Sequence, residues 1–90
     1  MSKLVYNKQK HYNFISVLIE PDNEKFRKKV LEILNNVSYC QESVIIDNTK
    51  QKIKYICYTV VIWGSEKDNI LNKLVKLFEE HGYKNKIIKT

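Results

Sequence analysis

The chain has 90 residues, of which 43% are hydrophobic and 29% charged; it is too apolar for a disordered chain and long enough for only one core. Sixteen Lys and Arg residues against ten Asp and Glu residues give a formal net charge of +6, which favours acidic partners such as nucleic acid, an anionic membrane surface or an acidic protein. All basic residues except Arg27 are lysines, which suit bidentate contacts with phosphates and bases less well than Arg and are abundant in chains encoded by AT-rich genomes.

The chain opens with a polar segment and then a strand. We expect residues 1–11 to form a flexible N-terminal segment and residues 12–90 to form a single domain. Residues 12–20, YNFISVLIE, alternate with a period of two and predict a strand. Pro21 ends this strand, because proline cannot donate a hydrogen bond to a sheet.

The next segment has the pattern of a helix followed by two strands. Asp22 is expected to cap a helix over roughly residues 23–36, in which apolar residues recur at helical spacing. Residues 40–48 predict a second strand, and a polar turn leads into a third strand over residues 52–64. This third strand, KIKYICYTVVIWG, is apolar or aromatic on both of its alternating faces.

The last third of the chain predicts a second helix and a short strand. Ser65 and Asp68 form an S-x-x-D helix start, close to a capping box, and a strong apolar stripe at helical spacing follows. Gly82 comes after the last turn, where a left-handed C-cap favours glycine. Residues 83–89, YKNKIIK, predict a final strand.

The order of these elements is β-α-β-β-α-β, which is the order of the split βαβ or ferredoxin-like arrangement. We therefore expect an α+β ferredoxin-like sandwich with a four-stranded antiparallel sheet and two helices on one face. In this topology the first and third strands are central, which explains why the third strand is apolar on both faces. The second and fourth strands lie at the edges, where the lysines of the fourth discourage unwanted pairing.

The alternation of the third strand predicts which side chains face the helices. We expect Ile56, Tyr58, Val60 and Ile62 to lie under the helices, whereas Cys57 and Thr59 point to the open face. A register error of one residue would exchange the two sets. The apolar residues expected on the open face, and proposed as an interaction face, are Phe14, Leu18, Tyr55, Val61 and Trp63.

Three hypotheses account for so apolar an open face. It could join copies of the chain or be covered by the N-terminal segment, or it could dock a different protein. It could also stack single-stranded RNA on Tyr55, Trp63 and Phe14, as RNA-recognition modules do. The lysines expected to contact the phosphates are Lys50, Lys52 and Lys54 along the hairpin and Lys84, Lys86 and Lys89 on the fourth strand. The segment Lys54–Tyr58 lacks the glycine of the RNA-recognition signature.

The sequence contains no recognisable active site, metal site or cofactor motif. Cys40 and Cys57 form no CxxC pair, and neither His11 nor His81 stands at metal-ligand spacing. There is no glycine-rich phosphate loop, no signal peptide at the polar start and no apolar run near the ~20 residues that span a bilayer. We expect an intracellular, cytoplasmic protein with reduced thiols, no cofactor and no enzymatic activity.

Two segments resemble the YbeD-like family of uncharacterised bacterial proteins. FISVLIEPDNEKFRKKVLEIL is similar to the strand, Pro-Asp-Asn turn and helix that open some members. TKQKIKYICYTVVIWGSEKDNILNKLVKLFEE looks like the hairpin and second helix of that family, with Thr49-Lys50 and Lys54-Tyr55 near its Ser and Lys-Tyr elements. The resemblance covers about residues 12–88 and implies a ferredoxin-like fold related in shape to ACT regulatory domains.

These observations predict a small binding or regulatory domain that acts through protein–protein contacts or homo-oligomerisation. The alternative from a different class is binding of single-stranded nucleic acid, chiefly RNA, through the basic and aromatic face. A further alternative is a phage or mobile-element protein that binds and inhibits a host target.

Overall fold

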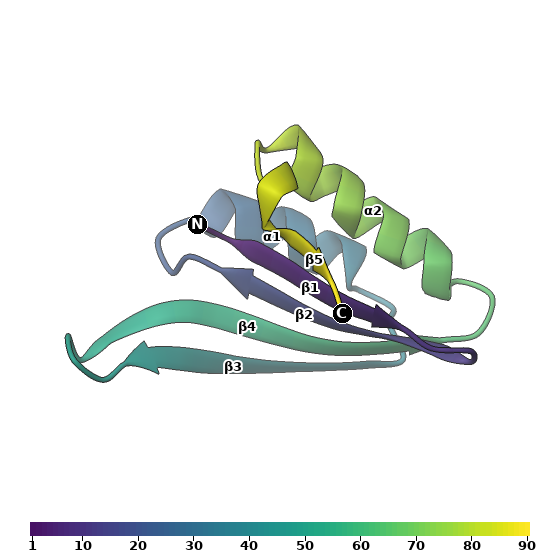
Figure 1. Ribbon diagram of the computed structural model, residues 1–90, viewed down its shortest axis with the longest axis horizontal. Coiled ribbons are helices and arrows are strands. Elements are labelled where there is room, and N and C mark those ends of the chain that lie inside the picture. The colour runs from purple at the N-terminus through teal and green to yellow at the C-terminus, as the bar shows by residue number, and fades with distance from the viewer.

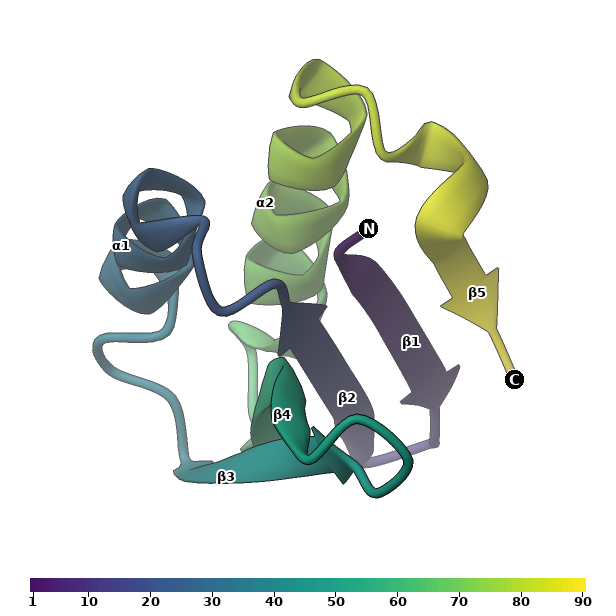
Figure 2. The ribbon, with the colours of Figure 1, turned by 90° about the vertical axis from the view of Figure 1, so that its left-hand side faces the viewer.

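The computed structural model describes residues 1–90 as a five-stranded sheet with two α-helices on one of its faces (Figures 1 and 2). The expected α+β class is therefore confirmed. The strands are β1 (Lys3–Lys8), β2 (Tyr12–Ile19), β3 (Tyr39–Asp47), β4 (Lys52–Trp63) and β5 (Ile87–Lys89). The helices are α1 (Glu24–Ile33) and α2 (Lys67–Glu80).

The strand order is β3-β4-β2-β1-β5, so the expected four-stranded antiparallel sheet is wrong both in strand number and in strand direction. β1 lies between β2 and β5, which would be neighbours in the ferredoxin-like arrangement. It pairs antiparallel with β2 and parallel with β5, and the sheet is therefore mixed. The expected edges are confirmed, because β3 and β5 lie at the two ends of the sheet.

The N-terminal segment is part of the sheet, which corrects the expectation that residues 1–11 are flexible. Leu4 is fully buried in the core beneath the helices, and Tyr6 packs against the same core. The β1–β2 connection is closed by the backbone N–H of Gln9, which donates to the carbonyl of Tyr12 over 2.8 Å. The burial of Leu4 and the pairing of β1 on both sides hold this segment in place.

The core lies between the helices and one face of the sheet. The expected inward face of β4 is confirmed, because Tyr58, Val60 and Ile62 are at most 2% exposed and Ile56 packs against the core. α1 contributes Phe26 and Val30 to this core, together with its C-cap residue Leu34. α2 contributes Leu71, Leu74 and Phe78.

The helix ends differ from the expected caps at both N-termini. Asn23, rather than Asp22, caps α1, and its side-chain oxygen accepts from the N–H of Phe26. α2 begins after Glu66 without a side-chain cap, and the Asp68 carboxylate instead accepts from the amide of Asn13 on β2 over 3.2 Å. This hydrogen bond is the largest cause of the lowered pKa of Asp68.

The C-terminal end of α2 confirms the expected glycine cap. Gly82 has φ +79°, and its N–H donates to the carbonyl of Glu79. The N–H of Tyr83 reaches back to the carbonyl of Phe78 over 2.9 Å, which completes a Schellman motif. The final strand is shorter than expected because a 3₁₀ turn occupies Lys84–Lys86.

The β3–β4 hairpin reaches well past the helices and the rest of the sheet (Figure 1). Its register shifts at Ile45 and Ile46, which pair with Tyr55 and Ile53 and leave Lys54 as the extra residue of a bulge. Every residue of β3 except Asp47 is exposed. β3 is thus a long edge strand with little of the molecule around it.

Candidate interaction face

The face of the sheet opposite the helices, called the open face below, carries an exposed group of aromatic side chains. The register places Tyr12 opposite Trp63, and Phe14 opposite Val61, which is in turn opposite Tyr39. These partners lie on one face because paired residues of antiparallel strands point the same way. The aromatic cluster consists of Tyr12 (40% exposed), Phe14 (42%), Tyr39 (46%) and Trp63 (54%).

The five residues predicted for the interaction face all lie on the open face but differ in exposure. Phe14 and Trp63 belong to the aromatic cluster, whereas Val61 and Leu18 are half-buried between their neighbours. Tyr55 is only 8% exposed. Its ring is flanked by Lys3 of β1 and by Lys54, whose ammonium groups each lie 5.8 Å from the ring centroid. Tyr55 is therefore covered and offers little surface to a ligand.

The open face is almost free of negative charge. Its polar positions near the centre are uncharged: Asn7, Ser16, Gln41, Ser43 and Thr59. Glu42 of β3 points to the helix side, so the β3 carboxylate on the open face is that of Asp47, at the far end of the strand, where it accepts from the backbone and hydroxyl of Thr49. These hydrogen bonds, the one from the hydroxyl foremost, lower the pKa of Asp47.

The lysines predicted for nucleic-acid contacts do not gather on the open face. Lys50 and Lys52 lie at the turn end of the β3–β4 hairpin, and Lys54 occupies the bulge beside Tyr55. On the other edge, Lys84 and Lys86 lie in the 3₁₀ turn. Lys89 is the register partner of Tyr6, whose ring packs on the core, so it lies on the helix side. No lysine-lined path therefore crosses the aromatic cluster.

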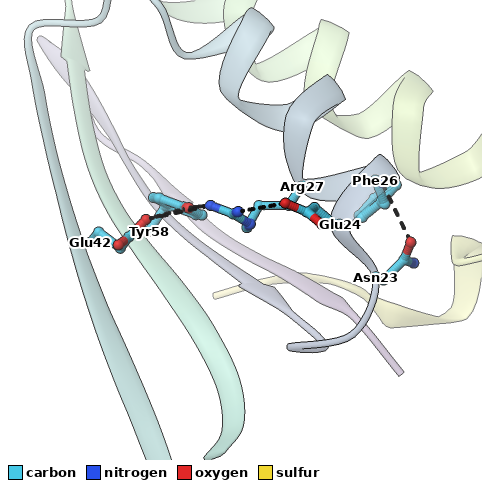
Figure 3. Close-up of polar contacts among 6 residues, drawn as sticks. All are labelled: Asn23, Glu24, Phe26, Arg27, Glu42 and Tyr58. Atoms are coloured by element: carbon cyan, nitrogen blue, oxygen red, sulfur yellow. Dashed lines mark hydrogen bonds and ion pairs between the residues drawn. The ribbon is translucent and has the colours of Figure 1, made fainter.

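A polar network behind the open face fixes the hairpin to α1 (Figure 3). The hydroxyl of Tyr58 donates to Glu42 on β3 over 2.5 Å and accepts from Arg27 on α1 over 3.4 Å. Arg27 also lies 3.6 Å from Glu24 and 4.0 Å from Glu42. The single arginine of the chain is thus used to hold strands and helix together.

This network favours a neutral tyrosine and a charged arginine. Burial is the largest cause of the raised pKa of Tyr58, and its hydrogen bond to Glu42 raises it further. The hydrogen bond with Tyr58 is in turn the largest cause of the raised pKa of Arg27. A tyrosine held protonated in this way orients its neighbours and is poorly suited to act as a base or nucleophile.

The other notable features of the molecule are a cleft between the two helices and two separate cysteines. A shallow cleft between the C-terminal end of α1 and the N-terminal end of α2 has walls from Glu32, Ile33, Glu66 and Ile70. No three His, Cys, Asp or Glu side chains gather closely enough to hold a metal ion. The two cysteines are unpaired. Partial desolvation of the thiol of Cys40, whose residue is otherwise exposed, raises its pKa and disfavours the reactive thiolate.

Two further findings concern the chain as a whole. Neither helix combines the length and the apolar character that crossing a membrane requires. Comparisons with known protein families, with curated proteins and with solved structures give no match. The resemblance to the YbeD-like family therefore stays a prediction.

Tyr12 and Tyr39 are members of the aromatic cluster that the sequence did not single out. Tyr12 lies two residues before Phe14 in β2, so the alternation of side chains already predicts that both point to the same face of the sheet. Tyr39 precedes the expected start of its strand by one residue. Its place beside Val61 depends on the pairing of β3 with β4, which no local pattern specifies.

Proposed function

We propose that this protein is a small non-enzymatic binding domain that docks another protein on its open face, with the aromatic cluster at the centre of the contact. The observation that carries the proposal is the concentration of four aromatic side chains, 40–54% exposed, on a face whose central polar positions are uncharged. Centres of protein interfaces have this composition, since aromatic residues are enriched there and charged residues depleted.

The position of the cluster on the sheet supports the same function. Phe14 and Trp63 stand on β2 and β4, which are paired with neighbours on both sides. Their backbones are therefore fixed before a partner arrives, and little conformational entropy is lost on binding. The polar network of Tyr58, Arg27 and Glu42 holds the third contributing strand, β3, from behind.

The proposal is tested by capture with matched variants. Wild-type protein, a Phe14→Ser/Trp63→Ser double variant and an Ile53→Ser control are immobilised and exposed to extract of the cells that express the protein. Ile53 is 48% exposed but lies away from the aromatic cluster, on the helix side of the hairpin tip. We expect one or more proteins to bind the wild type and the control, and to be lost from the double variant. Each is then purified and its affinity measured by calorimetry.

The expected loss is large, because truncating a central aromatic anchor costs about 2 kcal/mol or more, or at least roughly 30-fold in affinity. Thermal melts verify that the double variant remains folded. A set of captured proteins that is the same for all three immobilised chains would contradict the proposal.

Binding of single-stranded RNA is the second candidate, favoured by one observation. The open face has no carboxylate near the aromatic cluster. Lys3 and Lys54 add positive charge to the same face at Tyr55, toward the other end of β4. Bases could stack on Phe14 and Trp63 without repulsion from acidic groups. The placement of Lys84, Lys86 and Lys89 away from this face makes it the weaker candidate.

Fluorescence anisotropy with a labelled oligonucleotide separates the two candidates. Three or four lysine–phosphate contacts predict a slope of about −2 to −3 for log affinity against log salt on a single strand. Trp63→Ala would remove a stacking platform and weaken binding by about 1–3 kcal/mol. Binding weaker than about 100 μM at physiological salt, or equal for wild type and Trp63→Ala, would leave only the general attraction of a basic protein for nucleic acid.

A further inference from the structure

The two edges of the sheet are built in opposite ways. β5 has only three residues, follows Lys86 and ends in Lys89. Short edge strands and lysines are features that natural proteins use to keep a sheet edge from pairing. β3 has nine residues and contains no lysine, arginine or proline. Its outer backbone groups have no strand beside them, because β4 pairs with it on one side only.

The C-terminal half of β3 is apolar on both faces and exposed. Val44 is 53% exposed, Ile45 38% and Ile46 55%. Val44 and Ile46 point to the helix side beyond the reach of the helices, where Ile53 of β4 adds another exposed side chain, 48% accessible. A strand added at this edge would bury apolar side chains above and below the sheet.

We propose that the strand added at this edge is β3 of a second copy of the chain, paired antiparallel about a two-fold axis at Ile45. A two-fold axis perpendicular to the sheet is the closed way to join two identical edges into one continuous sheet. Pairing of β3 with β5 would be the open, propagating alternative, and β5 is too short to support it.

The sequence of β3 selects the register. Around Ile45, each Val44 stands opposite Ile46 of the second copy, and the two Ile45 side chains meet at the axis. Ser43 then faces Asp47, and Glu42 lies beyond the paired residues, level with the turn at Asn48 of the second copy, so no like charges oppose one another. The two residues of each pair are separated by an even number of positions in the sequence. They therefore point to the same face of the joined sheet.

Neighbouring registers lose this match. An axis at Val44 places Glu42 opposite Ile46 of the second copy, and an axis at Ile46 places Asp47 opposite Ile45. Each would set a carboxylate against an apolar side chain in the part of the edge that is to be buried. The strand is therefore complementary to itself in one register, which argues for a second copy over an unrelated peptide.

Sedimentation across about 1–500 μM protein at physiological salt tests the dimer. We expect the wild type to dimerise and both Ile45→Lys and Ile45→Glu to be monomeric, since like charges would meet at the axis and weaken association at least ~100-fold. Mixing the two variants should restore the dimer, because Lys and Glu then face each other. Ile88→Lys, at the β5 edge with 44% exposure, is the matched control and should dimerise like the wild type.

Melting curves of each variant show whether the monomer is folded. If Ile45→Lys is unfolded, a mixture of Ile46→Lys with Val44→Glu tests the same register through the adjacent pair. A wild type that stays monomeric at the highest concentration overturns the proposal, as does a mixture that stays monomeric.

A dimer that survives Ile45→Lys but is lost on Trp63→Ser also overturns it, and would assign self-association to the open face. The edge dimer and the proposed docking function use different residues. The capture experiment can therefore show no specific partner while sedimentation shows the dimer. Sedimentation can equally show a monomer while the capture experiment finds a partner.

Discussion

At the scale of single residues, Tyr58 joins three elements through one hydroxyl group. Replacing it by Phe keeps the buried ring but removes the hydrogen bonds to Glu42 and Arg27. We expect the free energy of unfolding of Tyr58→Phe to fall by about 1–2 kcal/mol at pH 7. Urea denaturation measures this loss. Tyr39→Phe is the control, because its exposed hydroxyl bonds only to nearby Gln41 and should cost less than about 0.5 kcal/mol.

The difference in stability between the wild type and Tyr58→Phe should decrease at high pH. The pKa of Tyr58 is raised in the folded state from its ordinary value of 10.0. Its contribution to stability is therefore complete below about pH 10 and is lost as the pH rises through the folded-state pKa. We expect the advantage of the wild type over Tyr58→Phe to shrink above pH 10, and a constant or growing advantage there would contradict this account of the network.

At the scale of elements, the end of α2 depends on Gly82. An added Cβ would meet no atom within 4 Å, but φ is +79°, where a side chain is strained. We expect Gly82→Ala to lower the free energy of unfolding by about 1 kcal/mol through the backbone alone. Chemical denaturation measures it, and Gly82→Asn should lose less because Asn tolerates the left-handed region better than Ala. An Ala variant as stable as the wild type would mean that the left-handed cap contributes nothing to stability.

The two faces of β4 can be compared at neighbouring positions. Val60 is fully buried under the helices, and Val61 is half-buried on the open face. Val60→Ala opens a cavity in the core and should cost about 2 kcal/mol, whereas Val61→Ala should cost clearly less. Equal losses in chemical denaturation, or a larger loss at Val61, would reverse the assignment of inner and outer faces.

The elements that were predictable from the sequence are those with a local signal. β2, β4 and both helices follow from period-two alternation and helical stripes, and Phe14 and Trp63 follow from the same alternation. β1 was not predictable, because its turn contains no glycine and its second partner, β5, is distant in the sequence. Because β1 was not predicted, the position of Lys3 over the ring of Tyr55 could not be predicted either.

The shortened final strand has a related explanation. Tyr83 packs edge-on against Phe26, with ring centroids 5.2 Å apart, and lies 5.9 Å from the ring of Phe78. These contacts hold Tyr83 with the helices, so the chain makes a 3₁₀ turn before it reaches the sheet. The contact between Tyr83 and Phe26 joins residues far apart in the sequence, so the alternation within residues 83–89 does not predict it.

At the scale of the whole molecule, the net charge of +6 acts on a body with extents of 41 × 24 × 24 Å. The Debye length is about 30 Å at 0.01 M salt and about 10 Å at 0.1 M, so lysines across the molecule repel one another at low salt and are screened at moderate salt. We expect the melting temperature to rise between these two salt concentrations, measured by calorimetry at low protein concentration. A fall would show that attractive ion pairs outweigh the repulsion.

The place of β1 between β2 and β5 also imposes an order of assembly. The β1–β2 and β3–β4 hairpins close short loops and can form early. β5 pairs only with β1, in a register that joins residues such as Leu4 and Ile87, which are 83 positions apart in the chain. β5 can join the sheet only after residues 3–8 have paired with β2. The long loop between β1 and β5 therefore closes late in folding, and its entropic cost is incurred at that step. We therefore expect β5 to be the last strand to join during folding and the first that thermal fluctuation releases.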